Sequence, residues 1–129
     1  MVEDSAADIR LVREALNEHK VDCVLIAVTD GEQAVKFMDE VDAGNESCPD
    51  LILLDLNLPR KPGREVLKRI KLSEKCERVP IIILTSSDNQ RDKDEVAPFN
   101  PTRYIRKPSK LDDFVKLGAI FKEILSGIE

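Results

Sequence analysis

The sequence contains no tryptophan, one tyrosine, one histidine and three cysteines in 129 residues. Cys23, Cys48 and Cys76 form no CxxC pair, and the single His19 does not complete a Cys/His set, which argues against a structural zinc site. Because the cysteines are odd in number and far apart, we expect reduced thiols in a cytoplasmic protein. The chain also lacks an apolar run of about 18 residues, the length that predicts a membrane helix, and it lacks a signal-peptide pattern.

The chain also lacks an excess of positive charge. The chain has 20 Lys and Arg against 25 Asp and Glu, which gives a net charge of -5 and a pI near 5.0. This balance argues against a nucleic-acid partner. The length suits one domain with a substantial core, and no linker, repeat or low-complexity segment divides it. We therefore expect residues 1–129 to form a single domain that binds neither nucleic acid nor membrane.

The ten residues 50–59, DLILLDLNLP, form the centre of what the chain does contain. Residues 51–54 are a short, unbroken apolar run, which predicts a strand buried on both faces of a sheet. The run stops at a carboxylate, Asp55. Taken alone, Asp55 fits two interpretations equally well: a residue that caps the next turn, and a functional carboxylate at a strand end.

Strand and helix patterns alternate along the chain. Strands are predicted at 21–28, 51–54, 79–85 and 103–106, and helices after Ser5, after Asp30, at 65–72, at 88–96 and from Ser109 to about Leu125. This alternation is typical of right-handed βαβ units, so we expect an α/β fold, a doubly wound parallel sheet with helices on both faces. Pro98 and Pro101 should keep the helix at 88–96 short.

Polar residues stand at three of the predicted strand ends, namely Asp55, Thr85 and Lys107. Glu3 and Asp4 directly precede the first predicted helix. Because the carboxyl ends of parallel strands lie along one edge of a sheet, we expect all five side chains to meet there. Each has an ordinary explanation when taken alone, since acids favour a helix start and a lysine is usually a solvated charge.

The chemistry of this group fits one task. Three carboxylates close together favour a cation between them, and oxygen ligands suit Mg²⁺. A carboxylate can attack a phosphoryl group to give an aspartyl-phosphate, while a metal and an ammonium neutralise the phosphoryl oxygens. A threonine hydroxyl can hydrogen-bond the product. The residues therefore favour Mg²⁺-dependent phosphoryl transfer onto Asp55.

The sequence resembles the receiver domains of two-component response regulators over nearly its whole length. The motifs LLDLNLP (53–59), ILTSS (83–87) and YIRKP (104–108) carry the resemblance, because they occur together and in this order. It implies a flavodoxin-like, CheY-like sheet with strand order 2-1-3-4-5. LVREAL (11–16) and DLNLPRK (55–61) further resemble single-domain regulators that are paired with phytochrome-type histidine kinases.

The resemblance also implies which residues bind the metal and the phosphoryl group. Asp55 would be the phosphoacceptor and a Mg²⁺ ligand. Asp4 would bind Mg²⁺ directly and Glu3 would bind it through water. The backbone carbonyl of Asn57 would be a further protein ligand.

Three more residues receive roles from the resemblance. Lys107 would pair with a phosphoryl oxygen, Thr85 would be the hydroxyl switch, and Tyr104 would be the aromatic residue whose exposure changes with it. The implied function is a receiver that takes a phosphoryl group from a sensor histidine kinase and switches an interaction face for a downstream protein. It would be no enzyme beyond catalysing its own phosphorylation and dephosphorylation.

The start of the chain departs from the family pattern. Only Met1 and Val2 precede Glu3, where a receiver has a whole central strand, so we expect a truncated first strand and a groove through the core. One explanation is that the numbering begins inside a longer chain. The other is that the start is truncated and the chain is impaired, in which case Glu3 and Asp4 would bind Mg²⁺ poorly.

Two other functions compete with a phosphoryl switch. A haloacid-dehalogenase-like phosphatase also uses a strand-end aspartate, but it needs a second acid two residues later, where this chain has Asn57. A phosphorylation-independent interaction module would keep the fold as a scaffold, and the truncated start favours it. The last predicted helix has an apolar surface wider than a single core-facing stripe. Two interpretations stay open: a helix buried on most sides, and a strip that forms a homodimer through the last helix and strand.

Overall fold

The computed structural model describes residues 1–127. The elements in chain order are α1 (Ala6–Glu18), α2 (Gly31–Asp42), β1 (Ile52–Leu54), α3 (Gly63–Leu72), β2 (Ile81–Thr85), α4 (Gln90–Val96), the 3₁₀ helix η1 (Ala97–Phe99), β3 (Arg103–Arg106) and α5 (Leu111–Ser126). The predicted alternation is confirmed except at residues 21–28, which form no strand. The helix before Pro98 is short, as expected, because η1 interrupts it.

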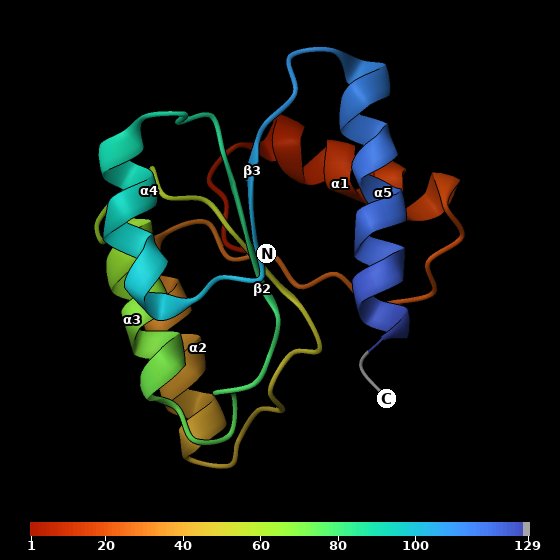
Figure 1. Ribbon diagram of the computed structural model, residues 1–129. Helices are drawn as coiled ribbons and strands as arrows, with labels where there is room; N and C mark the ends of the chain where they lie inside the picture. Colours follow the sequence, from red (N-terminus) through yellow and green to blue (C-terminus); the bar gives the residue numbers. More distant parts are fainter. Residues whose placement is uncertain (128–129) are drawn as a thin grey trace.

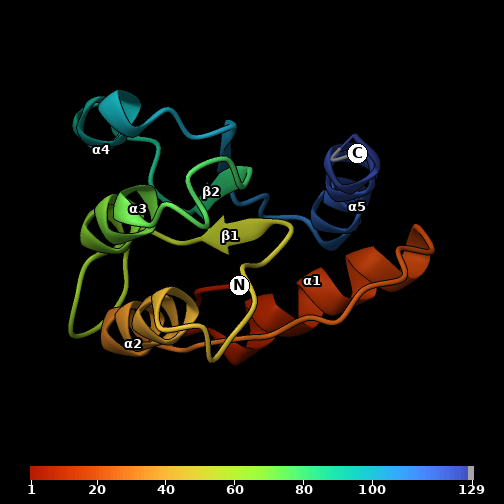
Figure 2. The same ribbon diagram turned by 90° about the horizontal axis from the view of Figure 1, so that it is seen from below.

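The three strands form a parallel sheet in the order β1-β2-β3 (Figure 1). Leu53 pairs with Ile82 and Ile83 pairs with Tyr104, which places β2 in the middle. Helices α1 and α5 cover one face of the sheet, and α2 and α3 cover the other, with α4 beside α3 (Figures 1 and 2). The helix layers on both faces of a parallel sheet confirm the predicted doubly wound α/β fold.

Strand β2 is buried along its whole length because it belongs to two hydrophobic cores. Ile81 and Ile83 pack in the core that α2 and α3 close, whereas Ile82 and Leu84 pack in the core that α1 and α5 close. Successive side chains of a strand point to opposite faces, so an unbroken apolar run serves both cores. This explains why the run IIIL forms a central strand.

Helix α5 uses one side for close packing against α1. Its buried residues Phe114, Leu117 and Phe121 point into the core. Gly118 lies so near α1 that a Cβ atom there would come within 2.3 Å of the Ala15 carbonyl oxygen. Much of the apolar surface that the sequence shows on this helix is therefore covered within the domain.

In the predicted order 2-1-3-4-5, strands 2 and 1 are reduced to isolated bridges at Val28 and Val2. Val2 forms parallel bridges to Val28 on one side and to Leu54 on the other, which matches the order 2-1-3 and confirms the truncated first strand. The predicted strand at 21–28 is wrong. A strand at residues 21–28 would have to pair with the first strand of the chain. That strand is reduced to Val2, so residues 21–28 have almost nothing to pair with. Val24 is consequently 87% exposed.

An apolar groove of about 820 Å³ lies where the first strand would continue. Leu25 and Ile26 line it from the segment before α2, and Leu51 and Leu53 line it from the region of β1. The Val2 N–H donates to the Leu53 carbonyl at 2.8 Å, but the Leu53 N–H itself has no backbone partner among residues 1–127. The groove therefore presents both apolar side chains and a free strand edge.

Cys48 and Cys76 form a disulfide, so the expectation of reduced thiols is wrong for this pair. Their Cα atoms lie 5.8 Å apart although 28 positions separate them in the sequence. The fold brings the loop before β1 next to the turn after α3, which no spacing rule indicates. Cys23 is a free, exposed thiol.

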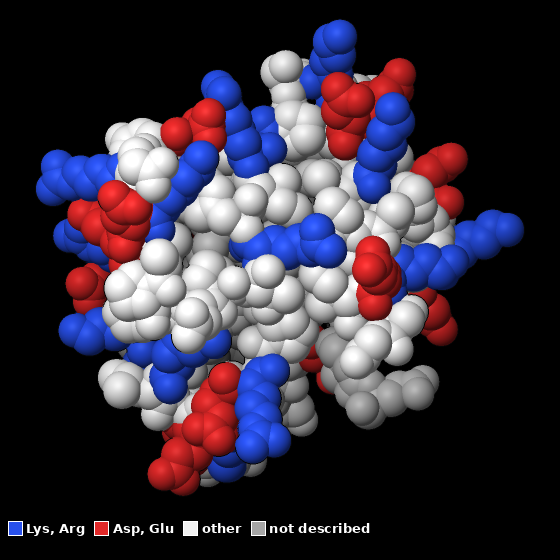
Figure 3. All heavy atoms as spheres, in the orientation of Figure 1, with Lys and Arg blue, Asp and Glu red and all other residues white. Residues whose placement is uncertain are grey.

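No helix within residues 1–127 is both long and apolar enough to cross a membrane. On the face shown in Figure 3, basic and acidic side chains are interspersed around a largely uncharged centre and do not gather by sign. A nucleic-acid surface would instead gather Lys and Arg on one face. The absence of a nucleic-acid partner stays a prediction.

Candidate functional site

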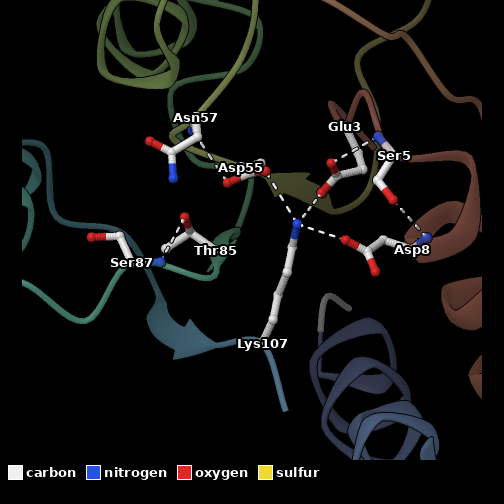
Figure 4. Close-up of polar contacts among 8 residues, drawn as sticks. All are labelled: Glu3, Ser5, Asp8, Asp55, Asn57, Thr85, Ser87 and Lys107. Carbon is white, nitrogen blue, oxygen red and sulfur yellow. Dashed lines mark hydrogen bonds and ion pairs between the residues drawn. The ribbon is translucent and has the colours of Figure 1, made fainter. Parts of the chain in front are cut away.

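Three strand ends meet at one edge of the sheet (Figure 4). Asp55 follows β1, Thr85 is the last residue of β2, and Lys107 follows β3. The Lys107 N–H donates to the Thr85 carbonyl at 2.8 Å, which ties the ends of β2 and β3 together. The Lys107 ammonium reaches back to β1 and donates to Asp55 Oδ2 at 3.1 Å. The structure thus brings together the strand-end residues that the sequence placed at one edge.

The ammonium of Lys107 is surrounded by three carboxylates. Its Nζ lies 2.6 Å from Glu3, 2.8 Å from Asp8 and 3.1 Å from Asp55 (Figure 4). Burial opposes the charged form of the lysine, but hydrogen bonds to Asp8 and Glu3 and the charge of Asp55 outweigh it and raise the pKa of Lys107 above its usual value. Lys107 is therefore held fully charged at the centre of the site.

Glu3 is the most deeply buried acid of the group. Its Oε1 accepts a hydrogen bond from the Ser5 N–H at 3.0 Å, whereas its Oε2 is buried and, within residues 1–127, meets only the Lys107 ammonium, at 2.6 Å. Burial raises the pKa of Glu3 to about 7, against the opposing effect of its hydrogen bond to Lys107. A buried carboxylate oxygen without a full set of donors favours an additional cation.

Glu3, Asp4 and Asp55 form a set of oxygen donors that fits a divalent cation. One carboxylate oxygen from each residue lies within 4.8 Å of the others. Hard cations such as Mg²⁺ prefer carboxylate and carbonyl oxygens and keep waters beside a few protein ligands. The Asn57 N–H donates to Asp55 Oδ1 at 3.2 Å and so orients the carboxylate. The role of the Asn57 carbonyl as a ligand stays a prediction.

A chain of contacts links Thr85 to Tyr104. Thr85 is fully buried, and its Oγ1 accepts a hydrogen bond from the Ser87 N–H at 3.4 Å. The Tyr104 hydroxyl donates to the Ser87 carbonyl at 3.0 Å, and burial raises the pKa of the phenol. The loop after β2 therefore connects the hydroxyl at the site with the aromatic residue on β3.

Asp8 is the site residue that sequence reasoning missed. Its local role is at the start of α1, where the Asp8 N–H donates to the Ser5 Oγ at 3.2 Å and Ser5 caps the helix. The missed contact is that of its carboxylate with Lys107. The sequence held one signal for this contact: Asp8 lies in the first turn of a helix that starts at the same edge of the sheet as the site.

A strand-end aspartate whose neighbours can neutralise added negative charge defines a class of protein, the signalling domain that carries a phosphoryl group. Within that class, the chain belongs to the response regulator receiver domain family, whose model matches residues 1–118.

The similar proteins include response regulators linked to phytochromes. Response regulator Rcp1 of Synechocystis sp. (strain ATCC 27184 / PCC 6803 / Kazusa) is 42% identical over 118 residues, which cover 91% of this chain and 80% of Rcp1. The Mn²⁺-bound structure of Rcp1 has a TM-score of 0.84 at 40% identity and covers 95% of this chain and 88% of its own. The structure of the phosphorylated cyanobacterial phytochrome response regulator RcpA has a TM-score of 0.88 at 37% identity. It covers 99% of this chain and 92% of its own.

A third structure shows magnesium in the active-site cleft of a relative. It is the receiver domain of a sensor histidine kinase from Pseudomonas aeruginosa, with a TM-score of 0.75 at 27% identity, covering 98% of this chain and 94% of its own. Divalent metals therefore occupy receiver sites in this family, and this chain has an acid cluster of its own.

These similarities confirm the resemblance on which the sequence interpretation depends. The chain is a response regulator receiver related to Rcp1 and RcpA, and its family accepts phosphoryl groups. Receivers are signal transducers rather than enzymes in the usual sense, as the sequence led us to expect.

Proposed function

We propose that Asp55 is the residue that accepts the phosphoryl group and that Mg²⁺ is the metal beside it. Asp4 and Asp55 would bind the ion directly, Glu3 would bind it through water, and the Asn57 carbonyl would be a further ligand. The contact that carries this proposal is that of the buried Lys107 ammonium with Asp55 Oδ2 at 3.1 Å, next to the acid cluster.

In the proposed reaction, a carboxylate oxygen of Asp55 attacks the phosphorus of a phosphohistidine or of a small acyl phosphate. An O–P bond forms, the bond from phosphorus to the donor's nitrogen or oxygen breaks, and the donor leaves with that electron pair. Lys107 pairs with a phosphoryl oxygen and Thr85 donates its hydroxyl to another. Bound Mg²⁺ would neutralise negative charge on the transferring group.

The signal would leave the site through the loop after β2. When the Thr85 hydroxyl turns toward a phosphoryl oxygen, it no longer accepts the Ser87 N–H, and the Ser87 carbonyl that holds Tyr104 shifts with it. Tyr104 would then change its exposure on β3. The hydrogen bonds of Ser87 with Thr85 and with Tyr104 support this route.

Catalysis in this proposal is limited to the chain itself, which promotes its own phosphorylation and dephosphorylation. The phosphatase alternative would require an acid at position 57 to move a proton. Asn57 has an amide there, and an amide does not act as a general acid or base. We therefore keep the signalling assignment.

The proposed phosphoryl donor is a sensor histidine kinase of the phytochrome type, and the likeness to RcpA supports it. The output partner would bind the face formed by α4, β3 and α5. A homodimer through α5 and β3 is part of the proposal; Leu111, which is 56% exposed, would lie at its centre. Analytical ultracentrifugation of the chain with and without acetyl phosphate would reveal such a dimer.

We propose that residues 1–129 act as one receiver domain in the cytoplasm. In that reducing compartment the disulfide between Cys48 and Cys76 would open. Because Cys76 is buried, the protein must be extracted into denaturant together with an alkylating reagent, and label is then expected on all 3 cysteines. Label on Cys23 alone would place the chain in an oxidising environment and contradict the cytoplasmic location.

Incubation with acetyl phosphate and Mg²⁺ tests the proposed function. We expect intact-mass measurement to show one added phosphoryl group, and Asp55→Asn, which keeps the size of the side chain but removes the nucleophilic oxygen, to show none. Omission of Mg²⁺ is expected to slow the formation of the adduct by at least about tenfold, since the charge of the transferring group is then only partly neutralised. An adduct of equal yield in Asp55→Asn would assign the acceptor elsewhere.

A second function has one observation in its favour. The first strand is reduced to the Val2 bridges, and Asp4, one of the proposed metal ligands, is exposed at the end of this short segment. A chain that takes up no phosphoryl group under these conditions but still binds its partner would be a phosphorylation-independent interaction module.

A further inference from the structure

Three carboxylates share the Lys107 ammonium, but they are not equivalent. Glu3 and Asp55 are also members of the acid cluster that fits a divalent cation, whereas Asp8 is not. The Asp8 side chain is 24% exposed, compared with 1% for Glu3 and 5% for Asp55. Asp8 therefore holds the lysine from the outer side of the site (Figure 4).

The lysine and a divalent cation draw on the same two carboxylates, Glu3 and Asp55. Two unit charges 4 Å apart near a protein surface repel by about 4 kcal/mol, and a doubly charged ion repels an ammonium more strongly. A cation that Asp55 binds directly and Glu3 binds through water would therefore push Lys107 away from both carboxylates. The Lys107 backbone is fixed to Thr85 by its N–H, so only the side chain can yield.

From this geometry we propose that Asp8 is a positioning residue, which holds the Lys107 ammonium when a divalent cation takes Glu3 and Asp55. The proposal rests on the proposed function insofar as the cation is Mg²⁺. It assigns to Asp8 a role in metal affinity without direct contact with the ion.

The local structure keeps Asp8 in place for this role. The Ser5 N–H donates to Glu3 Oε1, and the Ser5 Oγ accepts from the Asp8 N–H, so Ser5 links the metal-site acid to the outer carboxylate. Asp8 also lies in the first turn of α1, where the positive end of the helix favours an ionised acid. The carboxylate is thus available to the lysine whether or not a cation is bound.

Asp8→Asn removes the charge at nearly constant size and keeps the backbone N–H that Ser5 binds. Asp8 already contacts Lys107 before a cation binds, so it alters metal affinity only because it contributes more as the last carboxylate partner than as one of three. Without it, a cation at Glu3 and Asp55 would leave the ammonium with no carboxylate partner. We expect the Mg²⁺ dissociation constant to rise about tenfold, because a hydrogen bond between charged groups contributes that much or more. Asp8→Glu, which restores the carboxylate, is expected to recover most of the affinity.

A double-mutant cycle distinguishes action through Lys107 from a direct effect on the ion. Mg²⁺ affinity is measured by calorimetry in the unsubstituted chain, in Asp8→Asn, in Lys107→Met and in the double variant, with Lys107→Gln as a second background. The effect of Asp8→Asn is expected to fall to threefold or less, about the long-range charge effect alone, when the lysine is absent. The control is Asp113→Asn, an exposed acid on α5 whose one ion pair within residues 1–127 is with Lys116; this change should leave affinity unchanged.

Each outcome of the cycle either supports or overturns the proposed role of Asp8. An Asp8→Asn effect of the same size with and without Lys107 would make Asp8 a direct or water-mediated partner of the ion and overturn the proposal. No effect in the presence of Lys107 would overturn it as well, while the acetyl phosphate experiment could still support Asp55 as acceptor. If the unsubstituted chain binds no Mg²⁺, both this inference and the metal assignment fail.

Discussion

Adding five apolar residues before Met1 is expected to raise the free energy of unfolding by about 3 kcal/mol. Each side chain buried in the groove contributes about 2 kcal/mol, and the groove walls at Leu25 and Ile26, of which Ile26 is 52% exposed, are buried at the same time. Ordering the added residues costs about 1–2 kcal/mol each. New pairing with the free Leu53 N–H and with the segment before α2 makes the balance favourable.

Urea denaturation measures this gain. The matched control is an extension of five Gly and Ser residues, which has the same length but little to bury, and it should leave the stability of the chain nearly unchanged. Equal stabilisation by both extensions would show that the groove does not accept a strand. The apolar extension should also strengthen Mg²⁺ binding, because a continuous first strand would fix Glu3 and Asp4. Equal Mg²⁺ affinities with and without the extension would contradict that link.

Lys107→Met is expected to lower the free energy of unfolding by about 3 kcal/mol in the absence of divalent cations. Glu3 and Asp55 are almost fully buried, and Lys107 is the cation that both of them contact. Breaking a buried ion pair by removing one partner typically costs about 3–5 kcal/mol, and uptake of a proton by Glu3 would relieve part of this. The same change should make stability depend strongly on Mg²⁺, because the ion would replace the missing charge.

Urea denaturation with chelator and with millimolar Mg²⁺ measures both effects. Lys116→Met provides the control, since Lys116 is 77% exposed and its contact with Asp113 is 3.7 Å long. Exposed pairs of this kind contribute about 0–1 kcal/mol, so neither stability nor its Mg²⁺ dependence should change much. A Lys107→Met chain as stable as the unsubstituted one, with no greater response to Mg²⁺, would show that the acid cluster does not need a cation.

The strand ends could be predicted from the sequence because their signals are local. The run before Asp55 and the run before Thr85 are apolar without interruption, and a parallel sheet then places both residues at one edge. The motif that ends at Lys107 and Pro108 marks the third position. Topology converts these separate local signals into one site, so the meeting of Asp55 and Lys107 follows without any long-range information.

The remaining features depend on neighbours that the sequence does not show. Residues 21–28 have strand composition, but a strand needs a partner, and the first strand is reduced to Val2. Cys48 and Cys76 are paired by the folding of the chain between them. The contact of Asp8 with Lys107 could not be predicted, because the position of Asp8 at the start of α1 already accounts for an acidic residue there. Such a residue is found only when its partner is known.

The hydrogen bond from Tyr104 to the Ser87 carbonyl gives this protein a natural spectroscopic reporter. The sequence has no tryptophan and no other tyrosine, so the intrinsic emission of the chain comes from this single phenol. A change in the loop that joins Thr85 to Tyr104 alters the surroundings of that phenol directly. The optical signal of the unlabelled domain therefore follows events at the phosphoryl site without interference from any other fluorophore.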